Sequence, residues 1–264
     1  MSDAPHHVER GQGPAVVFLH GIGGDGTSWL PELDAMSSRC RAVAWDMPGY
    51  GDSPALPEMT FPSLAGALRD LLGRLEIEQA HLVGHSIGGM VALEFAARFP
   101  ERVASLVLYA TSPAFGKPDG DWQRDFLKAR LAPLDAGQRM AKLAPSIVES
   151  LIGDSPDEDG IARATAAMGR VPEAAYRAAM RCLVTFDRRD ALAELAVPTL
   201  VLAGEQDDNA PAAMMERMAG KIPGAHFQVI PGAGHLAHFE QPAAFRAALD
   251  AFFEQTITQG ATAS

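Results

Sequence analysis

Short apolar runs alternate with amphipathic stretches along most of this chain. The apolar runs have the length and the bounding turn residues of buried strands, and they cover residues 15–20, 41–46, 80–85, 103–110, 198–203 and 225–230. The amphipathic stretches repeat apolar positions at helical spacing and predict helices over residues 28–37, 62–75, 87–99 and 242–253. Strands that alternate with helices in this way form βαβ units. The pattern therefore predicts an α/β fold in which helices flank a mostly parallel central sheet.

Residues 111–197 interrupt this alternation. A crossover between neighbouring parallel strands needs only about a dozen residues, so most of the interval is surplus. It is rich in Ala, Arg, Leu and Met, and it is expected to form several short helices, one of them over residues 172–186. The breaks between these helices are expected at Pro133, Pro145, Pro156 and Pro172.

Three parts of the chain follow from this pattern. The core is expected to comprise residues 1–112 and 191–255, and a helical insertion is expected over residues 113–190. Residues 256–264 are small and polar, and we expect this tail to fray.

The junction between the strand at 80–85 and the helix at 87–99 carries a candidate nucleophile. It reads Gly84-His85-Ser86-Ile87-Gly88, and a G-x-S-x-G pattern in a strand–turn–helix is typical of a nucleophile elbow. Side chains at 84 or 88 would collide with neighbouring backbone in so tight a turn. The alternative is that Ser86 only caps the following helix.

A serine hydroxyl needs a base to take its proton, and His235 is the candidate. It lies in a glycine-rich loop after the last predicted strand, at the same carboxyl edge as Ser86. The acid that orients the imidazole is predicted to be Asp207, which follows the strand at 198–203 and completes the order Ser, Asp, His. Asp208 and Glu205 are the alternative acids.

The negative charge that acyl transfer builds on a carbonyl oxygen requires N–H donors. The backbone N–H of Ile87 is one candidate, and that of Ile22, in the loop HGIGG at residues 20–24, is the other. Both isoleucine side chains are expected to line an apolar acyl pocket. A glycine-rich loop can also bind phosphate, but neither G-K-[ST] nor G-x-G-x-x-G follows here.

The remaining histidines near these motifs are not expected to transfer protons. His20 and His85 flank residues whose backbone is critical and are expected to shape the site. His235 and His238 are three residues apart, but no further ligand stands nearby in a metal-like pattern. We therefore expect neither a metal nor a cofactor.

Several motifs in order resemble the α/β-hydrolase superfamily, in its lidded carboxylesterase and 3-oxoadipate enol-lactonase branch. They are HGIGG at 20–24, DMPGYGDS at 46–53, GHSIGG at 84–89, GEQD at 204–207, and Gly234-His235 followed by Glu240 and Pro242. The resemblance spans residues 8–253. It implies that the insertion at 113–190 is a helical lid over the active site, and that the family's first strand is missing or reduced at this short N-terminus.

This chain differs from other branches of the superfamily at key positions. Haloalkane dehalogenases and epoxide hydrolases use an aspartate where this chain has Ser86. Meta-cleavage C–C hydrolases usually carry Asn and Trp where this chain has His85 and Leu236. The last comparison disfavours that branch without excluding it.

The substrate contacts are predicted with less basis. Apolar residues that either line the pocket or pack in the core are Trp29, Trp122, Phe126, Leu143, Met180 and Leu236. Cations of the insertion that either meet a carboxylated substrate or are solvated at the surface are Arg124, Lys128, Arg130, Arg139 and Lys142.

Charge and composition exclude some partners. A formal net charge of −11 repels polyphosphates, so nucleic acid is not expected. No window approaches the roughly 18 apolar residues of a membrane span, and the N-terminus lacks a secretory apolar segment, so a cytoplasmic protein is expected. Cys40 and Cys182 are expected to be free thiols, and the oligomeric state is open between monomer and homodimer.

The leading hypothesis is therefore a serine hydrolase that cleaves a small carboxylic ester or lactone through an acyl-enzyme. Hydrolysis of a C–C bond in a meta-cleavage-type dienoate and perhydrolysis are alternatives within the same fold. A ligand-binding receptor with slow turnover is an alternative of another class, because fold does not determine function.

Overall fold

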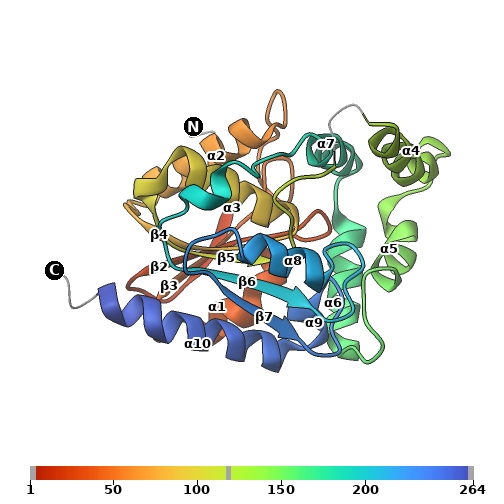
Figure 1. The fold of residues 1–264 in the computed structure, drawn as a ribbon. Helices are drawn as coiled ribbons and strands as arrows, with labels where there is room; N and C mark the ends of the chain where they lie inside the picture. The colour runs from red at the N-terminus through yellow and green to blue at the C-terminus, as the bar shows by residue number, and fades with distance from the viewer. Residues whose placement is uncertain (1–3, 117–119, 261–264) are drawn as a thin grey trace.

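The computed structural model describes residues 4–116 and 120–260, with residues 258–260 described by their backbone alone. Within these ranges one sheet contains β1 (His7–Arg10), β2 (Ala15–Leu19), β3 (Arg41–Trp45), β4 (Ala80–His85), β5 (Val103–Tyr109), β6 (Thr199–Gly204) and β7 (His226–Ile230). Their order across the sheet is β1-β3-β2-β4-β5-β6-β7 (Figure 1). β1 pairs antiparallel with β3, and the other neighbouring pairs are parallel. The predicted mostly parallel sheet is confirmed.

β1 is a strand that the apolar runs do not predict. Its four residues, HVER, contain a single apolar side chain, and they are half-buried or exposed. The strand forms because it pairs along the outer edge of β3, from His7 opposite Trp45 to Arg10 opposite Ala42.

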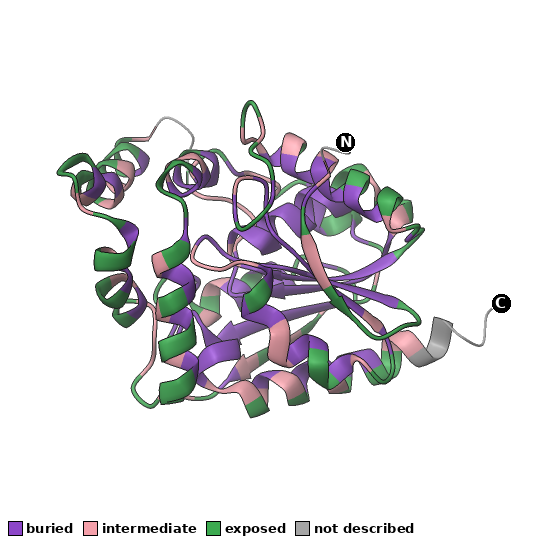
Figure 2. Ribbon diagram, turned by 180° about the vertical axis from the view of Figure 1, so that it is seen from behind, coloured by how far each residue is buried: buried purple, intermediate pink, exposed green. Residues whose placement is uncertain are grey.

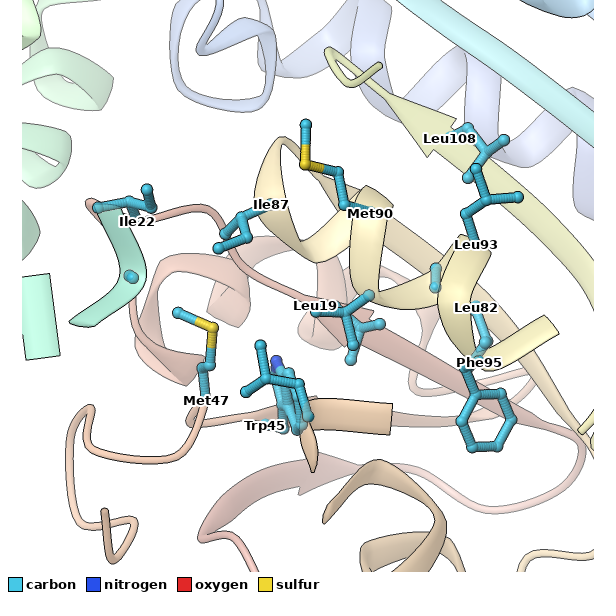
Figure 3. Packing of buried hydrophobic residues seen from close by; sticks show 14 of the residues in the cluster. Leu19, Ile22, Trp45, Met47, Leu82, Ile87, Met90, Leu93, Phe95 and Leu108 are labelled. Carbon is cyan, nitrogen blue, oxygen red and sulfur yellow. The ribbon is translucent and has the colours of Figure 1, made fainter. Parts of the chain in front are cut away.

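The sheet is apolar on both faces. In β2, Val17 and Leu19 join one core cluster, whereas Val16 and Phe18 join the cluster on the opposite face. Side chains of a strand alternate between faces, so a continuous apolar run is what a sheet covered on both sides requires. Figure 3 shows part of the first cluster, where Leu19 and Leu82 of the sheet meet helix residues such as Leu93. Fully burying one such side chain contributes roughly 1.5–3 kcal/mol.

Helices cover both faces of the sheet. The face of Val17 is covered by α2 (Phe61–Arg74), α3 (Ile87–Arg98) and α8 (Ala212–Ala219), and the opposite face by α1 (Leu30–Met36) and α10 (Pro242–Gly260). Short helical turns are η1 (Gly26–Trp29), η2 (Pro100–Arg102), η3 (Ala191–Glu194) and α9 (Ala237–Glu240). The inner strands β2 to β6 are almost entirely buried, and the outward helix surfaces are exposed (Figure 2).

The interval between β5 and β6 contains four helices: α4 (Asp121–Asp135), α5 (Met140–Glu149), α6 (Glu158–Arg170) and α7 (Glu173–Leu183). They gather beside one end of the sheet (Figure 1). The chain segments that enter and leave them are paired by an antiparallel bridge between Ala114 and Asp187. The guanidinium of Arg188, directly after this bridge, is paired with the buried carboxylate of Glu94 on α3. The insertion is thus joined to the core at its base.

Two predicted helix breaks in the insertion are wrong. Pro133 lies within the last turn of α4, and Pro145 lies inside α5. A proline removes one backbone hydrogen bond and strains the helix. In α5 the residues Ala144 and Val148, before and after Pro145, are both buried, and this packing stabilises the helix. Pro156 and Pro172 do lie between helices, as expected.

The C-terminal helix is longer than predicted. α10 continues to Gly260, so residues 256–260 of the expected tail are helical, while residues 261–264 lie outside the described residues. Phe252 and Phe253 are buried, and Ile257 packs against the same cluster, which extends the apolar contact beyond residue 253.

Two further expectations concern cysteines and membranes. Cys40 and Cys182 are both buried and not disulfide-bonded, as predicted. Among the described residues, no helix combines the length and the apolar character that crossing a bilayer demands.

Candidate active site

Three loops at the carboxyl edge of the sheet bring Ser86, His235 and Asp207 together. The Ser86 Oγ lies 3.0 Å from the His235 Nε2. The His235 Nδ1 lies 2.8 Å from the Asp207 Oδ2. Because a carboxylate only accepts, Nδ1 carries the proton and Nε2 is free to accept the proton of Ser86.

The backbone of Ser86 is in the left-handed region, with φ 54° and ψ −120°. β4 and α3 approach so closely that a Cβ at Gly84 would lie 2.5 Å from the Gly88 carbonyl oxygen. A Cβ at Gly88 would lie 2.2 Å from the carbonyl oxygen of Leu19. The side chain of Ser86 makes no capping hydrogen bond to α3. The alternative that Ser86 serves as a helix cap is therefore wrong.

Hydrogen bonds hold the strained turn at both ends of Ser86. Its N–H donates to the Tyr109 carbonyl at 3.0 Å. Its carbonyl accepts the Thr111 hydroxyl at 2.7 Å. Such a backbone conformation costs on the order of 1–3 kcal/mol, and these contacts from the neighbouring strand offset part of it.

The carboxylate of Asp207 is buried and accepts further hydrogen bonds. Its Oδ1 accepts the N–H groups of Asn209 at 2.8 Å and Ala210 at 3.0 Å. Burial raises the pKa of Asp207. The charge of His235 and these hydrogen bonds lower it by more, so that the pKa lies below its ordinary value. Asp208 is exposed, and Glu205 accepts the Gly232 N–H instead. Neither alternative acid is bonded to His235.

The main chain of His235 is held by neighbours on three sides. Its N–H donates to the Leu151 carbonyl of the insertion at 2.7 Å. Its carbonyl accepts the His85 Nε2–H at 2.9 Å and the Tyr109 hydroxyl at 3.2 Å. The imidazole is thus presented to Ser86 by a loop whose own polar groups are paired.

Glu240 binds the residues on either side of His235. Its Oε2 accepts the Gly234 N–H at 2.9 Å, and its Oε1 accepts the Leu236 N–H at 2.8 Å. The same Oε2 accepts the Gly153 N–H of the insertion at 2.6 Å. The side chain is buried, so three hydrogen bonds from backbone amides compensate the carboxylate. Sequence reasoning did not assign a role to Glu240, although its place in the motif after His235 was a signal.

His85 and His20 both line the cavity and bind backbone groups around it. Burial and the neighbouring His235 lower the pKa of His85 to about 3, so its ring is neutral at neutral pH. His20 joins two loops, because its Nδ1–H donates to the Gly21 carbonyl at 2.7 Å and its Nε2 accepts the Met47 N–H at 2.9 Å. Burial lowers the pKa of His20 as well.

A largely apolar cavity of about 250 Å³ opens beside Ser86 and His235. Four of the predicted contacts line it: Trp122, Phe126, Met180 and Leu236. Trp122 and Phe126 are stacked with ring centres 5.6 Å apart. Trp122 remains 59% exposed, which places it at the rim.

Two predicted contacts do not line the cavity. Trp29 is completely buried and stacked on His238, with ring centres 4.5 Å apart. Leu143 is half-buried and packs against the core. Ile147 and Val148, one turn later in α5, and Leu151, just after the helix, line the cavity instead. Lining residues that were not predicted as substrate contacts include Met90, Phe115, Tyr176 and Phe239.

The two isoleucines of the predicted oxyanion site differ. Ile22 lines the cavity, as expected. The side chain of Ile87 is completely buried in the core and does not line the cavity (Figure 3), so that part of the expectation is wrong. Neither backbone N–H is engaged in a hydrogen bond with another residue of the described ranges.

The described part of the chain contains no group of three or more His, Cys, Asp or Glu side chains positioned to hold a metal ion. His238, three residues after His235, contacts Tyr109, whose hydroxyl lies 3.2 Å from its Nδ1.

Comparison with known proteins agrees with this architecture. The chain is 32% identical to 3-oxoadipate enol-lactonase 1 of Acinetobacter baylyi over 88% of its own length and 85% of that protein. It is 30% identical to the biotin biosynthesis bifunctional protein BioHC of Cellvibrio japonicus over 93% of its own length, and it spans 48% of that longer protein. A thermophilic esterase from Thermogutta terrifontis has a TM-score of 0.87 at 28% identity, with 95% of this chain and 93% of that chain covered. Residues 16–248 match the model of the alpha/beta hydrolase family, and the chain belongs to that family.

Proposed function

We propose that this chain is a serine hydrolase that cleaves a small carboxylic ester or lactone through an acyl-enzyme intermediate. The observation that carries the proposal is the continuous hydrogen-bonded series from the Ser86 Oγ through His235 to Asp207, beside a largely apolar cavity. The esterase and enol-lactonase among the similar proteins support ester hydrolysis in general.

In the first half of the reaction, the Ser86 Oγ attacks the carbonyl carbon of the substrate while the His235 Nε2 takes the hydroxyl proton. The resulting imidazolium is stabilised by the Asp207 carboxylate. The proton then passes from Nε2 to the leaving alkoxide, which departs as an alcohol, and the acyl group remains esterified to Ser86. A lactone opens in the same step, and its hydroxyl end stays attached to the acyl group.

The second half uses water. His235 takes a proton from a water molecule, the hydroxide attacks the acyl carbon, and the proton returns to the Ser86 oxygen as the carboxylic acid leaves. In both halves negative charge develops on the carbonyl oxygen. The unengaged N–H groups of Ile22 and Ile87 are the donors that we assign to it, and removing one such donor typically costs on the order of a hundredfold or more in rate.

The insertion of residues 113–190 forms much of the cavity wall and is the proposed lid. It contributes Phe126 of α4, Ile147 of α5, Met168 of α6 and Met180 of α7. An apolar enclosure strengthens the electrostatic interactions inside it and excludes competing water.

The test compares the wild type with Ser86→Ala on 4-nitrophenyl esters of graded acyl length, simple lactones and a ring-fission dienoate. The matched control is Ser146→Ala, because Ser146 is exposed on α5 and its hydroxyl contacts only the Leu143 carbonyl among the described residues. We expect Ser86→Ala to lose ester turnover and fluorophosphonate labelling together, with Ser146→Ala unchanged. Full turnover by Ser86→Ala, or turnover of the dienoate far above that of every ester, would contradict the proposal.

A further inference from the structure

The cavity wall contributed by the insertion contains one guanidinium. Of the five cations of the insertion that were candidates for a carboxylated substrate, Arg130 of α4 lines the cavity, and the other four do not. Its Cζ lies 5.4 Å from the ring centre of Phe126, which also lines the cavity. Among the described residues, the guanidinium has no hydrogen bond and no carboxylate partner within salt-bridge distance. A charge so placed, against an aromatic ring, is available to a ligand.

The neighbouring helix α7 contributes a tyrosine to the same cavity. This residue, Tyr176, is only 2% exposed, and its hydroxyl has no hydrogen-bond partner among the described residues. α4 and α7 lie side by side (Figure 1) and are joined by an ion pair from Arg177 to Asp135 at 2.6 Å. Burial raises the pKa of Tyr176, and the positive charge of Arg130 lowers it in part. Since no group of the described residues engages this hydroxyl, it can donate to an acceptor in the cavity.

A carboxylate also lines the cavity, apart from the insertion. It belongs to Asp208, which follows β6. A substrate anion would be repelled there and attracted toward α4 and α7. The remaining wall is mainly apolar, with aliphatic and aromatic side chains from the insertion and the core.

We propose that Arg130 and Tyr176 form a carboxylate-binding subsite, and that the preferred substrates are esters or lactones with a carboxylate remote from the scissile carbonyl. The guanidinium and the phenol hydroxyl supply donors to the carboxylate oxygens, and the acyl chain spans the apolar wall toward Ser86. This inference rests on the proposed esterase function. It assigns to Arg130 and Tyr176 the choice between anionic and neutral substrates, and no step of the chemistry.

The test uses two esters of matched shape. The 4-nitrophenyl monoester of glutaric acid ends in a carboxylate, and 4-nitrophenyl 5-methylhexanoate ends in an isopropyl group of similar size. The measured quantity is the ratio of kcat/KM for the anionic ester to kcat/KM for the neutral ester. This ratio is compared between the wild type, Arg130→Met, Tyr176→Phe and the control Lys128→Met, which removes the same charge from an exposed position on α4.

We expect Arg130→Met to lower the ratio by roughly tenfold to a hundredfold, as for loss of a hydrogen bond to a charged group. Tyr176→Phe should lower it less, and Lys128→Met should leave it unchanged. The neutral ester reports that each variant is folded, since its kcat/KM should stay near the wild-type value. Glutarate should also inhibit hydrolysis of the neutral ester by the wild type more strongly than by Arg130→Met.

An unchanged ratio in Arg130→Met, or an equal fall in Lys128→Met, would overturn the subsite while leaving the esterase proposal intact. Absence of turnover of both esters by the wild type, together with absence of fluorophosphonate labelling at Ser86, would overturn the proposed function as well.

Discussion

Glu240 of α9 accepts the backbone N–H of Gly153 at 2.6 Å, and so joins the insertion to the loop that carries His235. The same carboxylate holds Gly234 and Leu236 on either side of the imidazole. A shift of the insertion at this contact is therefore transmitted to the position of His235. Neither Gly153 nor Glu240 belongs to the hydrogen-bonded series of Ser86, His235 and Asp207. Both nevertheless restrain His235 through the loop that carries it.

Glu240→Gln tests this restraint. The amide nitrogen of Gln donates, so at least one of the three N–H groups would face another donor and lose its acceptor. Hydrogen bonds to charged groups contribute about 1.5–3 kcal/mol each, and we expect the free energy of unfolding in urea to fall by about that amount or more. We also expect kcat on a simple ester to fall by roughly tenfold, with KM less affected.

The control for Glu240→Gln is Glu205→Gln. Glu205 accepts the Gly232 N–H of the same loop at 2.8 Å, but it is exposed. That variant should stay close to the wild type in both stability and kcat. Equal effects in the two variants would show that Glu240 has no special part in positioning His235.

Asp207→Asn separates the acid that contacts His235 from its neighbour. The amide keeps the shape of the carboxylate but favours the wrong tautomer of the imidazole, and such a change lowers kcat by roughly 10⁴-fold in a triad of this kind. Asp208→Asn alters the adjacent exposed residue, which makes no hydrogen bond to His235 among the described residues. Steady-state kinetics should show a loss of kcat in Asp207→Asn alone. A comparable loss in Asp208→Asn would transfer the role of the acid.

Gly88→Ala tests the close approach of α3 to β2. The added Cβ would lie 2.2 Å from the Leu19 carbonyl oxygen, so backbone must move, and we expect a loss of stability of roughly 1–3 kcal/mol as for overpacking. Gly66→Ala on α2 is the matched change, because nothing lies within 4 Å of the added atom. That variant should gain about 0.5–1 kcal/mol from helix propensity. Thermal unfolding of the two variants should shift in opposite directions, and a gain of stability in Gly88→Ala would contradict the packing argument.

Buried histidines make the free energy of unfolding depend on pH. Burial lowers the pKa of His81 from 6.5 to about 4. The unfolded chain therefore binds a proton at this residue at a higher pH than the folded chain does. The contribution to stability is complete above pH 6.5 and is lost as the pH falls toward 4. The full shift corresponds to roughly 3 kcal/mol.

His81→Asn removes this titration, so urea unfolding between about pH 8 and about pH 4 should show a shallower fall of stability in the variant than in the wild type. His20, His85 and His238, whose pKa values burial also lowers, should retain part of the slope in both proteins. His226→Asn, at an exposed position of β7, is the control. Identical slopes for His81→Asn and the wild type would contradict the prediction.

Much of the core was predictable because its signals are local. Buried strands such as β2 and β4 are continuous apolar runs, and α2 repeats its leucines at helical spacing. β1 lacked such a signal because pairing with β3, and not its own side chains, forms it. The extension of α10 was missed because residues 256–260 are small and polar apart from Ile257, which packs against the buried cluster on this face of the sheet.

The candidate site divides in the same way. Ser86, Asp207 and His235 were identified from turn motifs at strand ends, because parallel strands present their carboxyl ends at one edge of the sheet. The substrate contacts could not be identified in this way, because Trp29 and Leu143 are as apolar as the residues that do line the cavity. Arg130 was one of five equivalent cations in the sequence and differs from the others only by its place in the wall.

By itself, the sequence determined the α/β fold, the helical insertion, and the order and types of the three polar residues that meet at the sheet edge. Each of these depends on backbone conformations and periodicities that neighbouring residues encode. Only the tertiary structure decided which side chains form the cavity wall, how Glu240 restrains His235, and which cation is available to a ligand. Those relationships join residues far apart in the chain. The packing of whole helices sets the direction in which each side chain points, and no short stretch of sequence determines that packing.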